Sequence, residues 1–429
     1  MKVIAFYLPQ FHNIPENDEW WGDGFTEWVN VRRARPLFEG HDQPKIPLDG
    51  RYYNLLDADV KRWQASIARQ YGVYGFCYYH YWFDGRLLLE RPMEQMLADE
   101  TIDMPFCISW ANEAWTKAWV GENKVLIAQR YGGKEEWKAH FDYLLPFFKD
   151  SRYIRIDDRP LLVIYRAAVI GCFSTMIDYW QELARQAGLE GLYVVTQRPK
   201  GEAGEDRAMR IERGINFQPF CAKADLDNER GAAWRAFRAM GKRANNAIER
   251  GFGIDVMRRV ERLKQGGQLA MYDYDRVWGQ VLSQDCTEDF PGAYVKWDNT
   301  PRKGENGSVD VGATPAKFGG YMKRLIENTK SEYGLDYLFL TAWNEWAEGS
   351  YIEPDESDGF GYLSALKTAL DETAGGGLTH RPLAEATVQW AQAAPYRRRS
   401  RAVARRACSN VCAPHHGQLR TCNRGSYGA

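Results

Sequence analysis

The chain has 429 residues, of which 45% are hydrophobic and 26% are charged. This composition is typical of globular proteins and excludes wholesale disorder, and the length fits one large α/β barrel with insertions or two domains. Lys and Arg together number 56 and Asp and Glu 57, so the formal net charge is -1. Such a balance argues against a protein that binds nucleic acid.

Neither a membrane-spanning helix nor a signal peptide is expected from the sequence. No apolar run reaches the roughly 18 residues of a membrane-spanning helix. The N-terminal apolar run meets Pro9 early and has no signal-peptide core. Five of the eight Cys residues are far apart along the chain, which predicts free thiols in a reducing compartment rather than a disulfide framework. We therefore expect a cytoplasmic location.

Eight short apolar, β-branched or aromatic runs, bounded by turn residues, predict β-strands. In chain order they are Val3–Leu8, Tyr74–Tyr79, Pro105–Trp110, Leu161–Tyr165, Leu192–Thr196, Ile215–Gln218, Ala293–Trp297 and Tyr337–Ala342. Most are apolar throughout, as in parallel strands that are buried on both faces. Helical patterns lie between them, at Asp57–Tyr71, Glu135–Lys149, Thr175–Ala187 and Thr314–Tyr333. This alternation predicts a (β/α)8 TIM barrel, with a doubly wound open sheet as the alternative.

The barrel domain is expected to span residues 1–375, with two long additions. Pro9–Tyr53 forms a long first βα connection, and such connections tend to be functional. Residues 222–279 are charged and helical in pattern, which predicts a helical lid or a solvated excursion. Residues 376–429 form a tail that is expected to be disordered, because its end is rich in Arg and has no periodicity. The Cys and His residues of this tail match no closed zinc pattern, so no metal is expected.

Aromatic and polar side chains follow the carboxyl ends of nearly all predicted strands. The candidate substrate-binding residues are Tyr7, His12, Trp28, Tyr79, His80, Trp82, Trp110, Asn112, Glu113, Trp297, Asp298, Asn344, Trp346 and Glu353. In a barrel these strand ends meet at one face, where catalytic groups lie. Flat rings can pack against the C–H faces of a sugar, while amides and carboxylates bind its hydroxyls. The pattern predicts a glycan-binding pocket.

Two carboxylates near the last predicted strand are candidates for catalysis, because glycoside hydrolysis usually requires a pair. Glu345 and Glu348 are three residues apart and face the same side only if the chain leaves the strand at Trp346–Ala347, which Gly349 allows. One of the two is expected to have a raised pKa from burial beside the other. Glu113 and Glu27 are the next candidates. No dinucleotide, phosphate-loop, zinc-protease or serine-hydrolase motif occurs, so no cofactor is expected.

Six motifs of this chain together resemble the WbsX-type family. They are Phe6–His12, Gly24–Trp28, Gly75–Trp82, Trp110–Glu113, Trp297–Arg302 and Asn344–Gly349. The family is similar to glycoside hydrolase family 99, and its members are often described as glycosyltransferases of lipopolysaccharide O-antigen or other surface-polysaccharide assembly. The resemblance covers about residues 1–370 and implies a glycan substrate, with polysaccharide-assembly enzymes as possible partners.

A more distant resemblance is to glycoside hydrolase family 99 itself, the endo-α-mannosidases and endo-mannanases, which are (β/α)8 barrels. Their motif Asn-Glu-Trp-His-Glu-Gly, followed by Ile-Glu-Pro, is matched from Asn344 to Pro354, except that Ala347 stands where the hydrolases have His. This resemblance implies a retaining mechanism through an anhydro-sugar. Glu345 would take the proton of the sugar 2-hydroxyl, and Glu348 would be the general acid and then the base.

Two other functions fit the sequence. One is a nucleotide-sugar-dependent glycosyltransferase, although no Asp-x-Asp metal clamp follows a predicted strand. The other is a non-catalytic glycan-binding barrel, which would keep the aromatic walls without needing either carboxylate.

Overall fold

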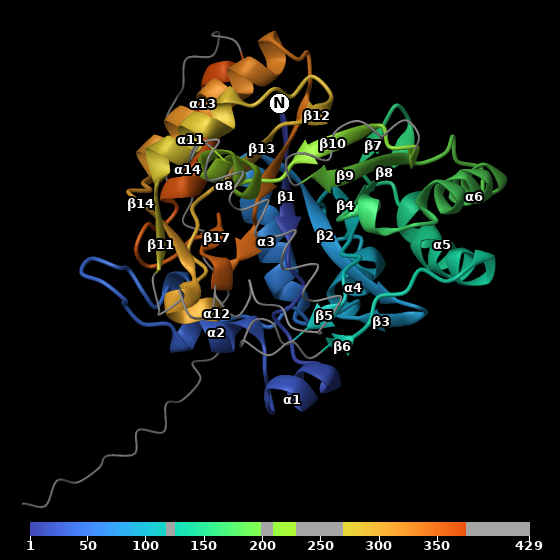
Figure 1. Ribbon diagram of the computed structural model, residues 1–429, viewed down its shortest axis with the longest axis horizontal. Helices are drawn as coiled ribbons and strands as arrows, with labels where there is room; N and C mark the ends of the chain where they lie inside the picture. Colours follow the sequence, from blue (N-terminus) through green and yellow to red (C-terminus); the bar gives the residue numbers. More distant parts are fainter. Residues whose placement is uncertain (117–124, 199–208, 229–268, 375–429) are drawn as a thin grey trace, which may run out of the picture. The chain divides into compact units, whose positions relative to one another are not determined.

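The computed structural model describes residues 1–116, 125–198, 209–228 and 269–374 (Figure 1). Its centre is a parallel sheet whose strands follow the order β12-β10-β9-β8-β4-β2-β1-β15-β13. These strands are β1 (Lys2–Tyr7), β2 (Val73–Phe83), β4 (Phe106–Trp110), β8 (Arg159–Ile164), β9 (Tyr193–Arg198), β10 (Arg213–Asn216), β12 (Asp289–Phe290), β13 (Gly292–Tyr294) and β15 (Tyr337–Thr341). Each of the eight predicted strands is present, with its ends shifted by a few residues.

The two ends of this strand order are neighbours in the sequence, because only Pro291 separates β12 from β13. β12 pairs with β10, whereas β13 pairs with β15, and Phe339 N donates a 3.0 Å hydrogen bond to Pro291 O. A Cβ on Gly292 would lie 1.8 Å from Asn216 O, so only glycine permits this close approach. The sheet is therefore a nearly closed barrel, which confirms the predicted (β/α)8 class and rules out the open sheet.

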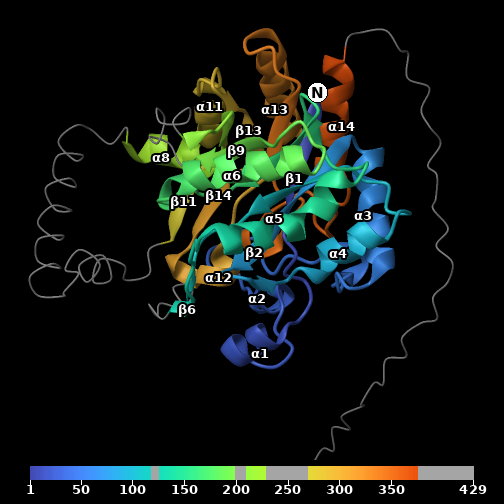
Figure 2. The ribbon, with the colours of Figure 1, turned by 90° about the vertical axis from the view of Figure 1, so that its right-hand side faces the viewer.

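Helices cover the outside of the barrel (Figures 1 and 2). They are α3 (Ala58–Gln70), α4 (Arg91–Ala98), α5 (Lys134–Lys149), α6 (Phe173–Gln186), α8 (Phe220–Asn228), α11 (Tyr274–Ser283), α13 (Pro315–Ser331) and α14 (Gly361–Thr373). Two of the predicted helices begin at side-chain caps, since Asp57 accepts a hydrogen bond from Asp59 N and Thr314 accepts one from Lys317 N. Gly188, the predicted stop, follows α6 with φ +83°.

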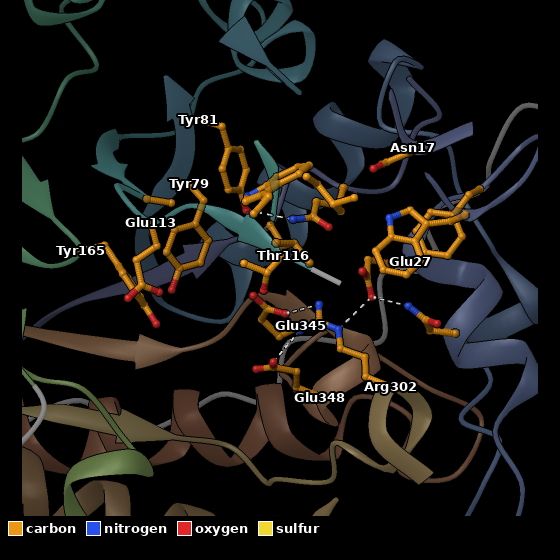
Figure 3. Close-up of a pocket in the computed structure, with 18 of the residues that line it drawn as sticks. Asn17, Glu27, Tyr79, Tyr81, Glu113, Thr116, Tyr165, Arg302, Glu345 and Glu348 are labelled. Atoms are coloured by element: carbon orange, nitrogen blue, oxygen red, sulfur yellow. Dashed lines mark hydrogen bonds and ion pairs between the residues drawn. The ribbon is translucent and has the colours of Figure 1, made fainter. Parts of the chain in front are cut away.

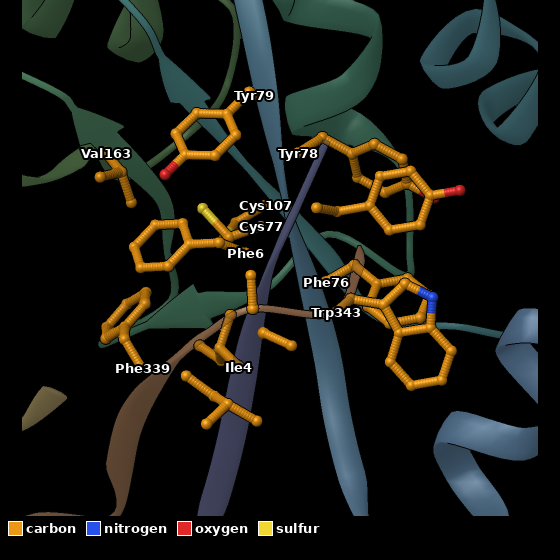
Figure 4. Close-up of a cluster of buried hydrophobic side chains, with 14 of the residues drawn as sticks. Ile4, Phe6, Phe76, Cys77, Tyr78, Tyr79, Cys107, Val163, Phe339 and Trp343 are labelled. Atoms are coloured by element: carbon orange, nitrogen blue, oxygen red, sulfur yellow. The ribbon is translucent and has the colours of Figure 1, made fainter. Parts of the chain in front are cut away.

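Side chains of successive residues on β1 point to opposite faces of the barrel wall, as strand geometry requires. Phe6 stacks on Tyr79 and also contacts Phe339 inside the barrel (Figure 4). Tyr7 faces the other way, where its ring contacts Phe76 and its hydroxyl donates a 2.6 Å hydrogen bond to Gln64 of α3. Aromatic rings thus fill the barrel and form the floor beneath its carboxyl-terminal face.

Shorter helices and strands lie at this face and in the connections between the barrel strands. They are α1 (Pro15–Trp21), α2 (Glu27–Arg33), η1 (Leu48–Gly50), β3 (Arg86–Leu88), β5 (Trp115–Thr116), β6 (Val125–Ile127), β7 (Arg155–Ile156), η3 (Ala167–Val169), β11 (Ala270–Asp273), α12 (Thr300–Lys303), η4 (Gly304–Asn306), β14 (Ser308–Val311), β16 (Asn344–Glu345), η5 (Trp346–Glu348) and β17 (Ser350–Tyr351). Among the described residues, none of the helices combines the length and apolarity that a bilayer crossing needs.

Two predicted segments can be compared with the structure only in part. In the expected insertion, residues 222–279, α8 covers the beginning, and β11 with the first part of α11 covers the end. Residues 229–268 and the tail from residue 375 onward lie outside the described residues. The helical lid and the disordered tail therefore stay predictions.

Candidate active site

A cavity of about 390 Å³ lies at the carboxyl ends of the barrel strands (Figure 3). Thr341 ends its strand, Tyr165 and Phe217 directly follow theirs, and Tyr79 lies within β2; all four line the cavity. Figure 3 shows Glu345, Glu348 and Arg302 between two sides of the cavity, one with Tyr79, Glu113 and Tyr165 and the other with Asn17 and Glu27. Carboxylates and aromatic rings therefore share one open space.

A tight turn after β15 brings both Glu345 and Glu348 to this cavity. Residues 346–348 form the 3-10 turn η5, and Gly349 follows in the left-handed conformation. The turn is held from two sides. The amide of Asn344 exchanges hydrogen bonds of 2.7 and 3.0 Å with the backbone of Leu8, and Asp298 N donates a 2.8 Å hydrogen bond to Glu348 O. The predicted departure from the strand at Trp346–Ala347 is thus present.

Arg302 of α12 joins three carboxylates at the centre of the cavity (Figure 3). Its Nη1 lies 2.5 Å from Glu348 Oε1, its Nη2 lies 3.4 Å from Glu345 Oε2, and its Nε lies 3.1 Å from Glu27 Oε2. The Arg302 and Glu27 side chains are 4% exposed, whereas that of Glu348 is 22% exposed. One buried cation therefore faces up to three negative charges, and Glu348 is the more accessible of the paired carboxylates.

Burial raises the pKa of Glu345 to about 8, and the negative charge of nearby Glu348 acts in the same direction. The positive charge of Arg302 opposes the shift in the pKa of Glu345 but does not cancel it. The direction agrees with the expectation that one member of the pair has a raised pKa. At neutral pH Glu345 therefore holds its proton in the free protein.

We expect the pH dependence of kcat/KM to be bell-shaped, with its alkaline limb near pH 8. Below that pH the pair keeps the proton that a general acid must donate, and above it both carboxylates are ionised. The measurement is kcat/KM on a cleaved oligosaccharide from about pH 5 to about pH 10. Activity that still increases well above pH 9 would contradict this proton count.

Two of the predicted substrate-binding residues, Tyr79 and Glu113, line the cavity. Burial raises the pKa of Tyr79 well above its ordinary value, so its hydroxyl stays protonated. Glu113 is 45% exposed and accepts a 2.7 Å contact from Arg166. Both side chains can reach a ligand in the cavity.

The other predicted substrate-binding residues are buried and do not line this cavity. They are Tyr7, His12, Trp28, His80, Trp82, Trp110, Asn112, Trp297, Asp298, Asn344, Trp346 and Glu353. Burial lowers the pKa of His12 to about 4 and that of His80 to about 3, so both rings are neutral. A direct contact with substrate stays a prediction for this set.

Glu353 supports the turn that carries Glu345 and Glu348. Its carboxylate accepts hydrogen bonds of 2.6 Å from Trp346 Nε1, 2.7 Å from the Tyr53 hydroxyl and 2.6 Å from Gln64 Nε2. Burial raises the pKa of Glu353 to about 7. Because Trp346 lies between Glu345 and Glu348 in the sequence, fixing its ring fixes the turn that carries both catalytic candidates.

Asp298 supports the same turn from the other side. Its carboxylate accepts a 2.6 Å hydrogen bond from Gln43 and lies 2.8 Å from His41 Nε2, so the first βα connection holds the residue whose backbone binds Glu348 O. These side chains come from distant parts of the sequence, which is why spacing alone does not separate supporting residues from lining residues.

Several lining residues are not among the candidate site residues of the sequence analysis. Arg302 ends one of the quoted motifs, but only the fold places it against three carboxylates. Tyr81 and Gln10 line the cavity together, and Gln10 Nε2 donates a 3.0 Å hydrogen bond to the Tyr81 hydroxyl. Tyr165 follows β8 directly, so the rule that strand ends carry the site could have found it.

Within the described parts of the chain, no group of three or more His, Cys, Asp or Glu side chains is arranged to hold a metal ion. Cys77, Cys107, Cys172, Cys221 and Cys286 are free thiols.

The fold and the site define a (β/α)8 barrel with paired carboxylates in an aromatic cavity. A similar barrel is the glycoside hydrolase family 99 endo-alpha-mannosidase from Bacteroides thetaiotaomicron, solved in complex with bis-tris-propane. The TM-score is 0.50 and the sequence identity 13%, with 87% of this chain and 97% of that chain covered, a likeness in fold alone.

The chain belongs to the WbsX glycosyltransferase family, whose model matches residues 3–366. It is 34% identical over 373 residues to the uncharacterized protein WxcX from Xanthomonas campestris pv. campestris strain ATCC 33913, and equally similar to WxcX from strain B100. These matches cover 86% of this chain and 49% of each relative. The chain thus spans about half the length of the curated relatives it matches.

Proposed function

We propose that the protein is a carbohydrate-active enzyme that breaks or transfers glycosidic bonds of a surface polysaccharide or its oligosaccharide precursor. One observation carries the proposal: two carboxylates on one turn, Glu345 and Glu348, face one ring-lined cavity and contact the same guanidinium. Family membership supports glycosyl chemistry. A role in O-antigen or related polysaccharide biosynthesis, a cytoplasmic location and assembly enzymes as partners belong to the same proposal.

The proposed reaction uses both carboxylates and conserves its protons. Glu345 takes the proton from the sugar 2-hydroxyl, whose oxygen attacks C1 and forms a 1,2-anhydro-sugar, while Glu348 protonates the departing glycosidic oxygen. In the second step Glu348 removes a proton from water or an acceptor hydroxyl, which opens the anhydro ring at C1, and Glu345 returns its proton to the 2-oxygen. The same pair therefore serves hydrolysis and transfer.

Proton placement adds a requirement to this mechanism. The free protein favours the proton on Glu345, whereas the first step needs Glu345 ionised and Glu348 protonated. Substrate binding must therefore select the less populated of the two single-proton states. Arg302 contacts both carboxylates. When the proton moves from Glu345 to Glu348, the ionised Glu345 gains the stronger charge interaction with Arg302, and the protonated Glu348 loses it.

The test is whether turnover needs an activated donor. The protein is incubated with labelled oligosaccharides, and separately with labelled sugar nucleotides with and without Mg²⁺. We expect cleavage or transfer from oligosaccharides without any nucleotide. Extension that depends on a sugar nucleotide would instead support the glycosyltransferase that the family's description names. Binding on a glycan array without turnover in either assay would support the non-catalytic barrel.

A further inference from the structure

One side of the cavity is not used by the proposed chemistry. We call it the α1–α2 wall, and it consists of Asn17, Trp21, Phe25, Asn30 and Arg33. In Figure 3 its member Asn17 lies across the cavity from Tyr79, Glu113 and Tyr165, with the Glu345–Glu348 pair between the two sides. A glycan bound at the pair can therefore extend toward this wall.

The loop between the two helices of the wall is held by specific hydrogen bonds. Asp18 Oδ1 accepts hydrogen bonds of 2.8 Å from Gly24 N and 3.2 Å from Phe25 N. Gly24 adopts φ +75°, which other residues rarely do. This loop sets the Phe25 ring 5.8 Å from that of Trp21, so the two rings form one apolar surface on the cavity.

The side-chain amide of Asn17 is available to a ligand in the cavity. The residue is 3% exposed and lines the cavity, and its side-chain amide forms no hydrogen bond with any other described residue. Its polar atoms are not among the fully buried side-chain atoms that lack a hydrogen-bond partner, so the amide faces the open cavity, where a ligand can reach it. Its place on the cavity wall makes a ligand hydroxyl the fitting partner.

Arg33 places a positive charge at the outer end of the same wall. Glu27, Asn30 and Arg33 are spaced by three residues and therefore share one face of α2. Glu27 and Asn30 are buried, whereas Arg33 is exposed and forms no ion pair with another described residue. Six residues of helix advance about 9 Å along the axis, so the backbone of Arg33 lies about 9 Å further along α2 than that of Glu27, a distance that one to two sugar residues can span.

We propose that the α1–α2 wall binds a second sugar residue of the glycan, and that this residue carries an anionic group, a carboxylate or a phosphate, which Arg33 contacts. The Asn17 amide hydrogen-bonds a hydroxyl of that sugar, and the Trp21–Phe25 surface packs against its ring. The substrate class is then an acidic glycan. The position of this sugar relative to the cleaved bond rests on the proposed function.

The experiment measures binding in a Glu348→Gln background, so that no turnover interferes. Isothermal titration calorimetry uses three series of disaccharides, built from glucose, galactose or mannose. Within each series the second residue is neutral, carries a 6-carboxylate or carries a 6-phosphate. We expect at least one acidic disaccharide to bind about tenfold more tightly than its neutral counterpart, with an affinity that decreases as salt is added. The carboxylate and phosphate series show which anion is preferred.

Variants locate the site. Arg33→Gln should abolish the preference for the acidic sugar, whereas Arg35→Gln, an exposed arginine that does not line the cavity, should keep it. Asn17→Ala should weaken the binding of neutral and acidic disaccharides alike, by several fold. No preference in any series, no binding by any acidic disaccharide, or equal losses in the Arg33 and Arg35 variants would each overturn the proposal.

Turnover separates this proposal from the proposed function. If wild-type protein cleaves a neutral glycan and Arg33→Gln leaves kcat/KM unchanged on every substrate, the acidic subsite fails and the enzyme remains. If acidic disaccharides bind through Arg33 but no glycan is cleaved or transferred, the subsite remains and the enzymatic proposal fails.

Discussion

Glu348→Gln will reduce kcat/KM on an oligosaccharide substrate by about a thousandfold while leaving glycan binding nearly unchanged. The amide keeps the size and hydrogen-bonding shape of the carboxylate but cannot donate the proton that the departing oxygen needs, and general acid catalysis typically contributes 10² to 10⁴ in rate. A glycosyl fluoride needs no such proton. The first step of this variant should therefore recover with a fluoride donor and appear as a burst of released fluoride.

Glu345→Gln should behave differently. It removes the group that takes the 2-hydroxyl proton, so the formation of the anhydro-sugar fails with every leaving group and the fluoride gives no burst. A matched control is Glu356→Gln, since Glu356 is exposed and lies in the same segment of the chain. If the glycosyl fluoride instead gave a burst in the Glu345 variant but not in the Glu348 variant, Glu345 would be the general acid and Glu348 would take the 2-hydroxyl proton. Full activity of either variant on the natural glycan would remove both residues from catalysis.

Arg302→Gln should destabilise the protein and abolish activity. The variant leaves Glu27, Glu345 and Glu348 close together without their cation, and removing one partner of a buried ion pair costs about 3–5 kcal/mol. The loss of Arg302 also raises the pKa of Glu345 further, because its positive charge now lowers that pKa. Urea denaturation at several pH values measures the free energy of unfolding.

The sign of the pH effect follows from linkage. A carboxyl group whose pKa is raised by folding stabilises the native state below its ordinary pKa, and this contribution is lost as the pH rises through the folded value. For Glu345 that window runs from about 4.5 to about 8 in the wild type and extends further upward in the variant. The stability deficit of Arg302→Gln should therefore be smallest near pH 5 and largest near pH 9.

Two further variants sharpen the result. Arg302→Lys keeps one positive charge and should recover more stability than activity, because a single ammonium cannot hold three carboxylates in the same fork geometry. Arg35→Gln removes an exposed arginine and should show neither the deficit nor its pH dependence. A deficit of equal size at pH 5 and pH 9 would show that the cluster's charges do not set the stability of this region.

The two carboxylates that meet at the cavity, Glu345 and Glu348, were predictable as a pair because the determinants of their position are local. Glu345 and Glu348 follow a continuous apolar run, and the glycine after them permits the turn that brings both to the cavity, so the five residues from 345 to 349 contain the information. Which of the neighbouring residues line the cavity and which only support it from behind was not predictable in the same way. Tyr7 and Phe6 are equally aromatic neighbours, and only the register of β1 against β2 decides that Phe6 faces the barrel interior while Tyr7 contacts Gln64.

Arg302 and Asn17 show what spacing cannot reveal. Arg302 is separated from Glu27 by 275 positions, yet its Nε lies 3.1 Å away from that carboxylate. Asn17 is one of several polar residues of the short helix α1, and its importance becomes visible only once its side chain is found on the cavity wall.

Taken alone, the amino-acid sequence determined the barrel, its strands and the pair of acids, because strand burial and helix periodicity are properties of short segments. Which aromatic and polar side chains open onto the cavity, and which cation holds the acids together, was decided by the tertiary structure. The physical reason is that barrel closure brings together residues hundreds of positions apart, and the charge and burial of each depend on neighbours that no local pattern contains.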